Sequence, residues 1–485
     1  MLAKLAPHAS VLSVVELAEI SHVLFVLPKS EQLPVFPGSE TLRALLKRRA
    51  MKASQLAGTP LFGTLPHGGL AAWTMLDLTK PVFEQHTVLR KAVQPLLEEN
   101  PKTLCISVHG TRDERAKAGH LAAYVAWANG AELPQRKKKP QFKSLAAIAI
   151  YGAPESNGFE ALRARAEGNV LCRELTILPP NELTPELYRQ RIRKIAKDCG
   201  WEHEEFGLQK LRKMGAGAFV AVAQGSFEED AAIVHLRYRH RRAKHSLALV
   251  GKGICFDTGG HNLKPARSMH GMHQDMNGSA VCLGILLGAT RAELAVNVDC
   301  WLAIAQNHIG PKAYKQNEVV KALNGTTIEI VHTDAEGRMV LADTLTMAAK
   351  GKPAVIIDFA TLTGSMVVAL GERYSGVLGN REGLLAQAVA AGKASGERMC
   401  LFPLDEDYEQ ALDSKIADIK QCTLDGEADH ILAGCFLKRF VHDLPWLHVD
   451  LSASSCKGGL GAVASDITGF GVGWGMEMIK TIIRA

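Results

Sequence analysis

The sequence has 485 residues, and 56 Lys and Arg against 50 Asp and Glu give it a formal net charge of +6. A single hydrophobic core stops growing at roughly 250–300 residues, so this length excludes an ordinary one-domain protein. Hydrophobic residues make up 47% of the chain and charged residues 22%, which are ordinary values for a globular protein. So mild a charge does not by itself indicate a nucleic-acid or membrane partner.

The cysteines and the N-terminus bear on the compartment. Ten cysteines are scattered along the chain without a Cys-x-x-Cys pair, and Cys282 is one of several within apolar runs. This usage is typical of reduced thiols in a reducing compartment. Glu16, Glu19 and His22 interrupt the apolar stretch at residues 11–28, so we expect no secretory signal. No run of about 18 apolar residues exists, so we expect no membrane span and a cytoplasmic protein.

Residues 1–157 are expected to form a small N-terminal α/β domain. The apolar and helical patterns predict strands at 23–27, 103–108 and 145–151, and helices at 40–56 and 112–130. Residues 133–143 are expected to form an exposed loop. Their basic run at 136–139 is a candidate nucleic-acid contact, but no aromatic residues are interleaved for base stacking. We therefore favour a solvated loop and expect no nucleic-acid partner.

Residues 158–180 are expected to link this domain to a larger one over residues 181–485. The linker is predicted as a helix that Pro179 and Pro180 end. Helices and apolar strands then alternate, with helices expected at 185–199 and 277–293 and strands at 231–237, 246–250, 295–305 and 354–361. Residues 215–224 are expected to form a turn that leads into a strand. The basic segment 237–245 is expected to be a solvated hairpin rather than a nucleic-acid contact. The pattern predicts an α/β fold with a mixed, mainly parallel sheet flanked by helices.

Two carboxylates lie close together in the segment 331–338. Asp334 and Glu336 follow an expected strand at 326–330 and precede an expected helix at 339–350, so we expect both in a strand-to-helix turn. The carboxyl end of a strand is where α/β folds bind ligands. Carboxylate oxygens are hard ligands that suit a divalent cation. On this segment alone, an acidic surface loop explains the pattern equally well.

The segment 251–264 supplies a second part of the pattern. Its four glycines permit close backbone approach and positive φ, and it contains Asp257. With Asp275, Asp334 and Glu336, the carboxylates suffice for two metal ions that share bridging ligands. An aspartic protease would need two Asp-Thr-Gly loops in all-β lobes. A nucleotide-binding P-loop would need Gly-x-x-x-x-Gly-Lys-(Ser/Thr), which the segment lacks.

Five signatures occur in order: Gly-Lys-Gly (251–253), Phe-Asp-Thr-Gly-Gly (256–260), Asn-Leu-Lys (262–264), Asp-Met (275–276) and Thr-Asp-Ala-Glu-Gly-Arg (333–338). Over roughly residues 170–485 the chain therefore resembles the leucyl aminopeptidase (cytosol aminopeptidase) family of dinuclear metallo-exopeptidases. The resemblance implies an aminopeptidase that cleaves peptides with a free N-terminus, uses two divalent ions (Mn²⁺ or Zn²⁺) and bicarbonate, and forms a homohexamer. The alternative is an inactive metal-binding or regulatory protein with the same fold, against which the intact residue set argues.

The resemblance also implies the ligand set. Asp257 and Glu336 would bridge the two ions, Asp334 would bind one ion, and Asp275 and Lys252 would bind the other. Lysine is an unusual ligand because its amine must be neutral to donate a lone pair. Desolvation and two nearby cations lower the pKa of a lysine, which would make this possible.

Further roles follow by the same resemblance. Lys264 would be the catalytic lysine that polarises the scissile carbonyl. Arg338 would hold a bicarbonate ion that acts as general base, with Leu362 at its contact. The positions that match the family's pocket for the first side chain are Met272, Thr361 and Gly364.

The chain departs from the family pattern at several positions. Residues 450–453 read Asp-Leu-Ser-Ala in place of Asp-Ile-Ala-Gly. Because of this departure, the resemblance does not decide the far wall of the substrate pocket or a preference for leucine. His261 and His332 stand where the family has other residues. A histidine near a metal site is a candidate ligand or a partner of a ligand. We expect each to be simply hydrogen-bonded.

Overall fold

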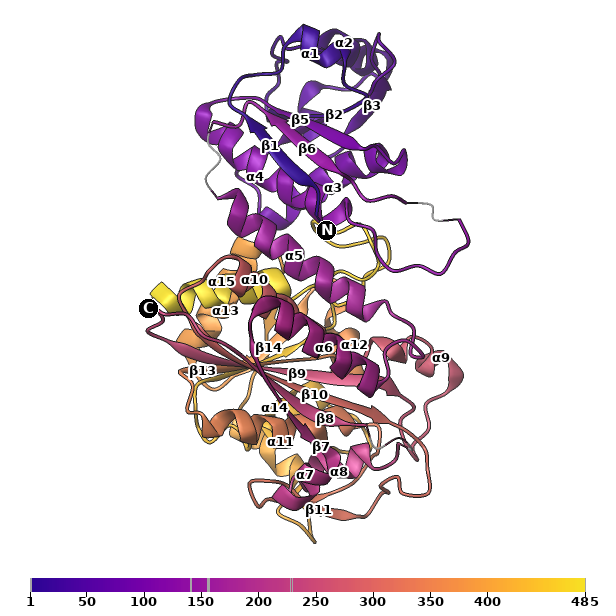
Figure 1. Cartoon of the computed structure of the whole chain (residues 1–485), viewed down its shortest axis with the longest axis vertical. Coiled ribbons are helices and arrows are strands. Elements are labelled where there is room, and N and C mark those ends of the chain that lie inside the picture. The colour runs from indigo at the N-terminus through magenta and orange to yellow at the C-terminus, as the bar shows by residue number, and fades with distance from the viewer. Residues whose placement is uncertain (1, 140–141, 155–157, 227, 229, 485) are drawn as a thin grey trace. The chain divides into compact units, whose positions relative to one another are not determined.

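The computed structural model describes residues 2–139, 142–154, 158–226, 228 and 230–484, and the chain divides into two compact units (Figure 1). The smaller unit comprises Met1–Val170, Lys393–Gly396 and Cys456–Thr468, and the larger unit comprises the rest. Helix α5 (Phe159–Thr176) is the predicted linking helix, and the first unit ends within it. The division into domains at residues 157 and 180 stays a prediction.

The smaller unit is built on a six-stranded sheet in which only β3 and β4 are antiparallel neighbours. The strands in sheet order are β1 (Lys4–His8), β6 (Ala147–Tyr151), β5 (Thr103–Val108), β2 (His22–Pro28), β4 (Leu70–Leu76) and β3 (Leu61–Thr64). Alternate residues of β2 enter two different cores, Phe25 one and Leu24 the other. Successive side chains of a strand point to opposite faces, so this sheet is covered on both faces.

The helical segments of the smaller unit are α1 (Val14–Ala18), α2 (Ser39–Arg48), η1 (Ala53–Ala57), α3 (Val82–Glu98) and α4 (Arg112–Asn129). The prediction of one helix over 40–56 is wrong beyond Arg48. Ala50 adopts a positive φ of 50°, which an α-helix does not allow, and a short 3₁₀ helix follows from Ala53. The predicted helix at 112–130 is confirmed within one residue.

The larger unit contains an eight-stranded sheet. Its strands in order are β15 (Met399–Leu401), β14 (Ser375–Gly379), β17 (Trp446–Asp450), β13 (Val355–Ala360), β9 (Ser246–Asp257), β10 (Asn297–Asn307), β8 (Ala232–Tyr238) and β7 (Glu202–Gly207). The pairs β14–β17, β10–β8 and β8–β7 are antiparallel and the other pairs are parallel. The predicted mixed, mainly parallel sheet is therefore confirmed.

Helices cover both faces of this sheet. The helical segments of the larger unit are α6 (Pro185–Cys199), α7 (Leu208–Met214), α8 (Gly217–Ala223), α9 (Ala266–Met269), η2 (Met272–Gln274), α10 (Asn277–Arg291), α11 (Glu336–Lys350), α12 (Gly364–Leu370), α13 (Glu382–Ser395), η3 (Glu406–Leu412), α14 (Asp429–Lys438) and α15 (Val472–Arg484). A separate small sheet joins β11 (Val319–Lys321), β12 (Thr327–Glu329) and β16 (Ile419–Lys420). Helices α10 and α15 lie on one face of the large sheet, and α11 and α14 lie on the other (Figure 1). None of the described helices is long and apolar enough to span a bilayer.

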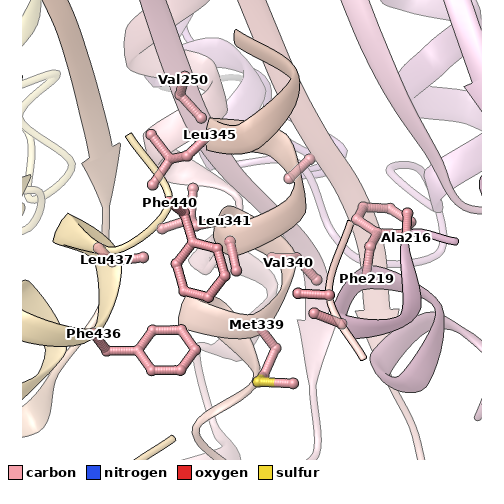
Figure 2. Packing of buried hydrophobic residues seen from close by; sticks show 14 of the residues in the cluster. Ala216, Phe219, Val250, Met339, Val340, Leu341, Leu345, Phe436, Leu437 and Phe440 are labelled. Atoms are coloured by element: carbon pink, nitrogen blue, oxygen red, sulfur yellow. The ribbon is translucent and has the colours of Figure 1, made fainter. Parts of the chain in front are cut away.

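Helix α11 lies at the centre of a large hydrophobic core. It is buried from Glu336 to Ala349, and its apolar side chains pack against α8 and α14. Figure 2 shows Leu341 and Met339 beside the rings of Phe436 and Phe440. This burial holds the first turn of α11 in place, and that turn carries two of the predicted site residues.

The predicted turn into a strand at 215–224 is wrong, because residues 217–223 form helix α8. Its N-cap residue Ala216 has no polar side chain, yet the N–H of Phe219 is satisfied by Asp343 Oδ2 at 2.8 Å. A carboxylate at this place does what an N-cap side chain normally does and favours a helix start. Asp343 belongs to α11 and is 124 residues away, so the local sequence did not reveal the cap.

The predicted hairpin at 237–245 is also wrong. The segment connects β8 to β9, but these strands are not paired with each other. Strand β10 lies between them, antiparallel to β8 and parallel to β9. A strand from later in the chain therefore occupies the place where a hairpin partner would pair.

Candidate metal centre

Strand β9 supplies two of the predicted ligands. Lys252 lies within this central strand and Asp257 ends it. Gly251 is required here because a Cβ atom on it would lie 2.5 Å from the Cα of Ser279 in α10. The glycine therefore allows α10 to approach β9, and Asp275 lies just before the start of that helix.

The acidic segment 331–338 begins after β12, as predicted, but β12 belongs to the small sheet rather than the large one. Asp334 lies in the expected turn. Glu336, however, is the first residue of α11, so its placement in the turn is wrong. The carboxyl end of the large sheet still contributes to the site, because Asp257 ends β9 and Thr361 follows β13. Strand ends of that kind are where α/β sheets bind ligands.

Three carboxylates converge in the structure. Oxygen atoms of Asp257, Asp334 and Glu336 lie within 4.8 Å of one another. Lys264 Nζ lies 2.9 Å from Asp257 Oδ2 and 2.6 Å from Asp334 Oδ1. Lys252 Nζ lies 2.8 Å from both Asp275 Oδ2 and Glu336 Oε1. The two lysines thus connect all four predicted carboxylates in one cluster.

Neighbouring groups orient these carboxylates. Asp257 Oδ1 accepts hydrogen bonds from the N–H of Gly259 and from Asn307 Nδ2, both at 2.8 Å. The hydroxyl of Thr361 donates to Asp275 Oδ1 at 2.7 Å. Partners of this kind fix the direction in which a ligand's remaining lone pairs point.

The site is strongly coupled electrostatically. Burial, together with the charges of Glu336 and Asp257, raises the pKa of Asp334 to about 7. Burial also raises the pKa of Asp275 to about 8. Burial alone would lower the pKa of Lys252, but Asp275, Glu336 and Asp257 together raise it. A neutral Lys252 amine, which a bond to a metal ion requires, is therefore reached only if the cations offset this carboxylate charge.

The residues present fit divalent cations. Glu336 is 1% exposed, and its Oε2 has no hydrogen-bond partner among the described residues. A buried carboxylate oxygen without a partner is costly in a folded protein. A hard cation bound to Glu336 and its neighbours would supply the missing partner, and carboxylates are suitable ligands for it.

The cluster opens into a pocket with a volume of about 520 Å³. All eleven predicted site residues line it: Lys252, Asp257, Lys264, Met272, Asp275, Asp334, Glu336, Arg338, Thr361, Leu362 and Gly364. The pocket wall also contains Asp450, Leu451 and Ser452, which belong to the segment 450–453 that departs from the family pattern. The structure therefore brings together residues from segments that are far apart in the chain.

Comparison with known proteins identifies the family. A model of the catalytic domain of the cytosol aminopeptidase family matches residues 170–474. The chain belongs to the cytosol aminopeptidase family. It is 38% identical over 354 residues to a probable cytosol aminopeptidase of Methylorubrum populi, which covers 72% of this chain and 70% of the relative. It is 37% identical to a second one from Acidovorax ebreus, over 90% of this chain and 88% of that relative.

A solved structure has the same fold. The bottromycin maturation enzyme BotP, in complex with Mn, superimposes with a TM-score of 0.82 and 28% identity over 96% of this chain and 100% of its own. The family and its relatives make this chain a metal-dependent aminopeptidase, and so a hydrolase that acts on peptides.

The histidines of this aminopeptidase make ordinary hydrogen bonds. His261 Nδ1 lies 2.9 Å from the carbonyl oxygen of Tyr314. His332 Nδ1 accepts the N–H of Asp334 at 3.2 Å, and its side chain lines the pocket. Both observations agree with the expectation of hydrogen-bonded side chains.

Arg338 has partners that its sequence position did not predict. It is 2% exposed, and its guanidinium donates to Asp429 Oδ1 at 2.8 Å and to the carbonyl oxygen of Gln421 at 2.9 Å. Asp429 and Cys422 both line the pocket, and neither was among the predicted site residues. The only local signal at Asp429 is an acidic residue at the start of a helical pattern, which is common in any helix.

Proposed function

We propose that this aminopeptidase removes N-terminal residues with a water molecule activated by two divalent ions, held by Lys252, Asp257, Asp275, Asp334 and Glu336. The observation that carries the proposal is the convergence of three carboxylates within 4.8 Å beside a buried, unpartnered Glu336 oxygen. When bound, two such ions lower the pKa of a water toward ~7 and stabilise negative charge on the substrate.

Lys264 is proposed to polarise the scissile carbonyl. Its side chain is 15% exposed, and it is held by Asp257 and Asp334 at the edge of the carboxylate cluster. A fixed ammonium group favours the negative charge that develops on the carbonyl oxygen. Because Lys264 is already oriented by two carboxylates, little reorganisation is needed when that charge appears.

A general base is required to accept the proton of the attacking water. By resemblance to the family, which uses bicarbonate here, we propose that this base is an oxyanion beside Arg338 and Leu362. The guanidinium of Arg338 is buried and lines the pocket, so it supports this role as a fixed positive charge beside the oxyanion. The first side chain of the peptide is proposed to lie against Met272, Thr361 and Gly364, which line the same pocket.

The resemblance supports three further proposals. The ions are proposed to be Mn²⁺ or Zn²⁺, and the solved relative BotP is described in complex with Mn. The assembly is proposed to be a homohexamer. A cytoplasmic location is proposed because the ten cysteines are all free thiols and because the relatives are named cytosol aminopeptidases.

Metal removal tests the proposed function. The purified protein is assayed on a panel of amino-acid amides before and after exhaustive chelation, and again after addition of Mn²⁺ or Zn²⁺. We expect chelation to abolish hydrolysis and the added ion to restore it. Full activity after complete metal removal would contradict the proposal. Tight metal binding without hydrolysis of any amide would favour the inactive regulatory alternative.

A further inference from the structure

The one arginine predicted to hold an external anion already holds a carboxylate of this chain. Arg338 is buried, and its Nη2 lies 2.8 Å from Asp429 Oδ1. The other terminal nitrogen donates to the carbonyl oxygen of Gln421. Both terminal nitrogens of the guanidinium therefore have protein partners, and the negative charge beside it comes from Asp429.

The second oxygen of Asp429 is not used in the pair with Arg338. The Asp429 side chain is 23% exposed and lines the same pocket as Glu336 and Lys264. The hydrogen bond and ion pair of its side chain to Arg338 both use Oδ1, so Oδ2 makes none to the residues that the structure describes. A carboxylate oriented through one oxygen and free at the other has the arrangement of a proton acceptor.

The backbone around Asp429 is strained. Ala428, which precedes it, adopts a φ of 52° and a ψ of 26°, the left-handed region that a residue with a Cβ seldom occupies. Strain of this kind persists only where surrounding contacts enforce it, and it is frequent at functional sites. The turn at Ala428 begins helix α14 with Asp429 as its first residue, where the helix dipole favours a negative charge.

We propose that Asp429 is a catalytic residue of this aminopeptidase, which takes the place of a bicarbonate ion beside Arg338. The O–H bond of the attacking water breaks, and the proton passes to Asp429 Oδ2. The water oxygen keeps the electron pair and bonds to the carbonyl carbon, while the π pair of the C=O bond moves to the carbonyl oxygen, from which it returns when the C–N bond breaks. When the C–N bond then breaks, its electron pair stays on nitrogen, and the proton passes from Asp429 to that leaving amine. Asp429 ends the cycle as a carboxylate, so no external base is consumed.

This inference rests on the proposed metal-dependent hydrolysis and adds one consequence, independence from bicarbonate. The metal-loaded wild-type protein is assayed in buffer freed of carbon dioxide and in the same buffer with added bicarbonate. We expect the two kcat values to agree. A wild-type enzyme that is metal-dependent but needs bicarbonate would overturn the role of Asp429 and leave the proposed function intact. A wild-type protein inactive in both buffers would instead contradict the proposed function.

Substitution and rescue test the residue itself. We expect Asp429→Ala to lower kcat by about 10²-fold or more with little change in KM, the usual effect of losing a general base. Added formate or bicarbonate should recover at least ~10-fold of this loss, because such an oxyanion fits beside Arg338 and accepts a proton. Chloride balances the charge of Arg338 but is a far weaker base, so it should not rescue. Equal rescue by chloride, or an unchanged kcat, would overturn the proposal.

Two further variants separate catalysis from structure. Asp429→Asn keeps the size of the side chain and an oxygen for Arg338, but it cannot accept a proton, so we expect the loss of kcat without rescue. A normal kcat in Asp429→Asn would overturn the proposal even if Asp429→Ala does not fold. Asp443→Ala is the matched control, since Asp443 pairs with Arg381 on the surface and is 90% exposed. Metal content equal to that of the wild type in each variant is the expected result, and loss of metal in Asp429→Asn would assign it a structural role instead.

Discussion

The side chains of Lys252 and Glu336 meet inside the pocket, with Nζ 2.8 Å from Oε1. Gly337 makes this approach possible, since a Cβ atom on it would lie 2.7 Å from Lys252 Cε and 2.8 Å from Nζ. The glycine of the Thr-Asp-Ala-Glu-Gly-Arg signature is thus explained by the space that a lysine 85 residues upstream in the chain occupies. Lys252 and Glu336, which belong to separate signatures, can approach each other only because residue 337 has no side chain.

Gly337→Ala should therefore displace Lys252. The lysine chain is flexible at its end, so we expect a small loss of stability but a clear loss of metal retention and of kcat. Elemental analysis after dialysis and steady-state kinetics measure the two effects. Gly383→Ala is the matched control, because a Cβ at this exposed helical position meets nothing within 4 Å. Full metal content and normal kcat in Gly337→Ala would show that the close approach is not needed.

Lys264→Ala should lower kcat by about 10²-fold or more, because a fixed charge that stabilises the transition state is lost. KM should change less, since the substrate's ground state gains little from this lysine. Lys480→Ala serves as the control, because Lys480 pairs only with Glu477 on helix α15. If Lys264→Ala retains a near-normal kcat, the lysine does no more than balance the charge of Asp257 and Asp334.

The Asp257→Ala variant should retain fewer metal ions per chain than the Asp334→Ala variant. Asp257 is proposed to bind both ions, so its removal weakens both metal sites, whereas Asp334 is proposed to bind only one ion. Asp257 is also the better oriented, with two hydrogen bonds to Oδ1. We expect dialysed Asp334→Ala to keep about one ion per chain and Asp257→Ala to lose most of both. Two ions retained in Asp257→Ala would mean that Asp257 does not bridge them.

Asp343→Ala should destabilise the larger unit. Asp343 is buried and accepts the N–H groups of Phe219 at 2.8 Å and Leu323 at 2.7 Å. The substitution leaves two backbone donors without their partner, at a cost of about 2–4 kcal/mol in the free energy of unfolding. Chemical denaturation followed by circular dichroism measures the change. Asp198→Ala, an exposed control on helix α6, should shift the value by less than about 0.5 kcal/mol.

Much of the fold was predictable because its signals are local. The helix at 185–199 agrees with α6 at both ends, since Thr184 caps it, Pro185 begins it and Gly200 ends it in the left-handed conformation. Strands β10 and β13 and the first five residues of β9 were also predicted, because a strand covered on both faces is a continuous apolar run. Hydrophobic composition along a short segment suffices for such elements.

The sequence by itself determined which residues form the carboxylate and lysine cluster, because their signatures are short and occur in one order. Only the tertiary structure decided that α8 is a helix capped by Asp343, that β10 separates β8 from β9, and that Arg338 pairs with Asp429. Each of these depends on groups far apart in the chain, 124 residues for the cap and 91 for the ion pair. A hydrogen bond or ion pair of this kind forms only after packing brings two segments together, so the local sequence of neither segment predicts its partner.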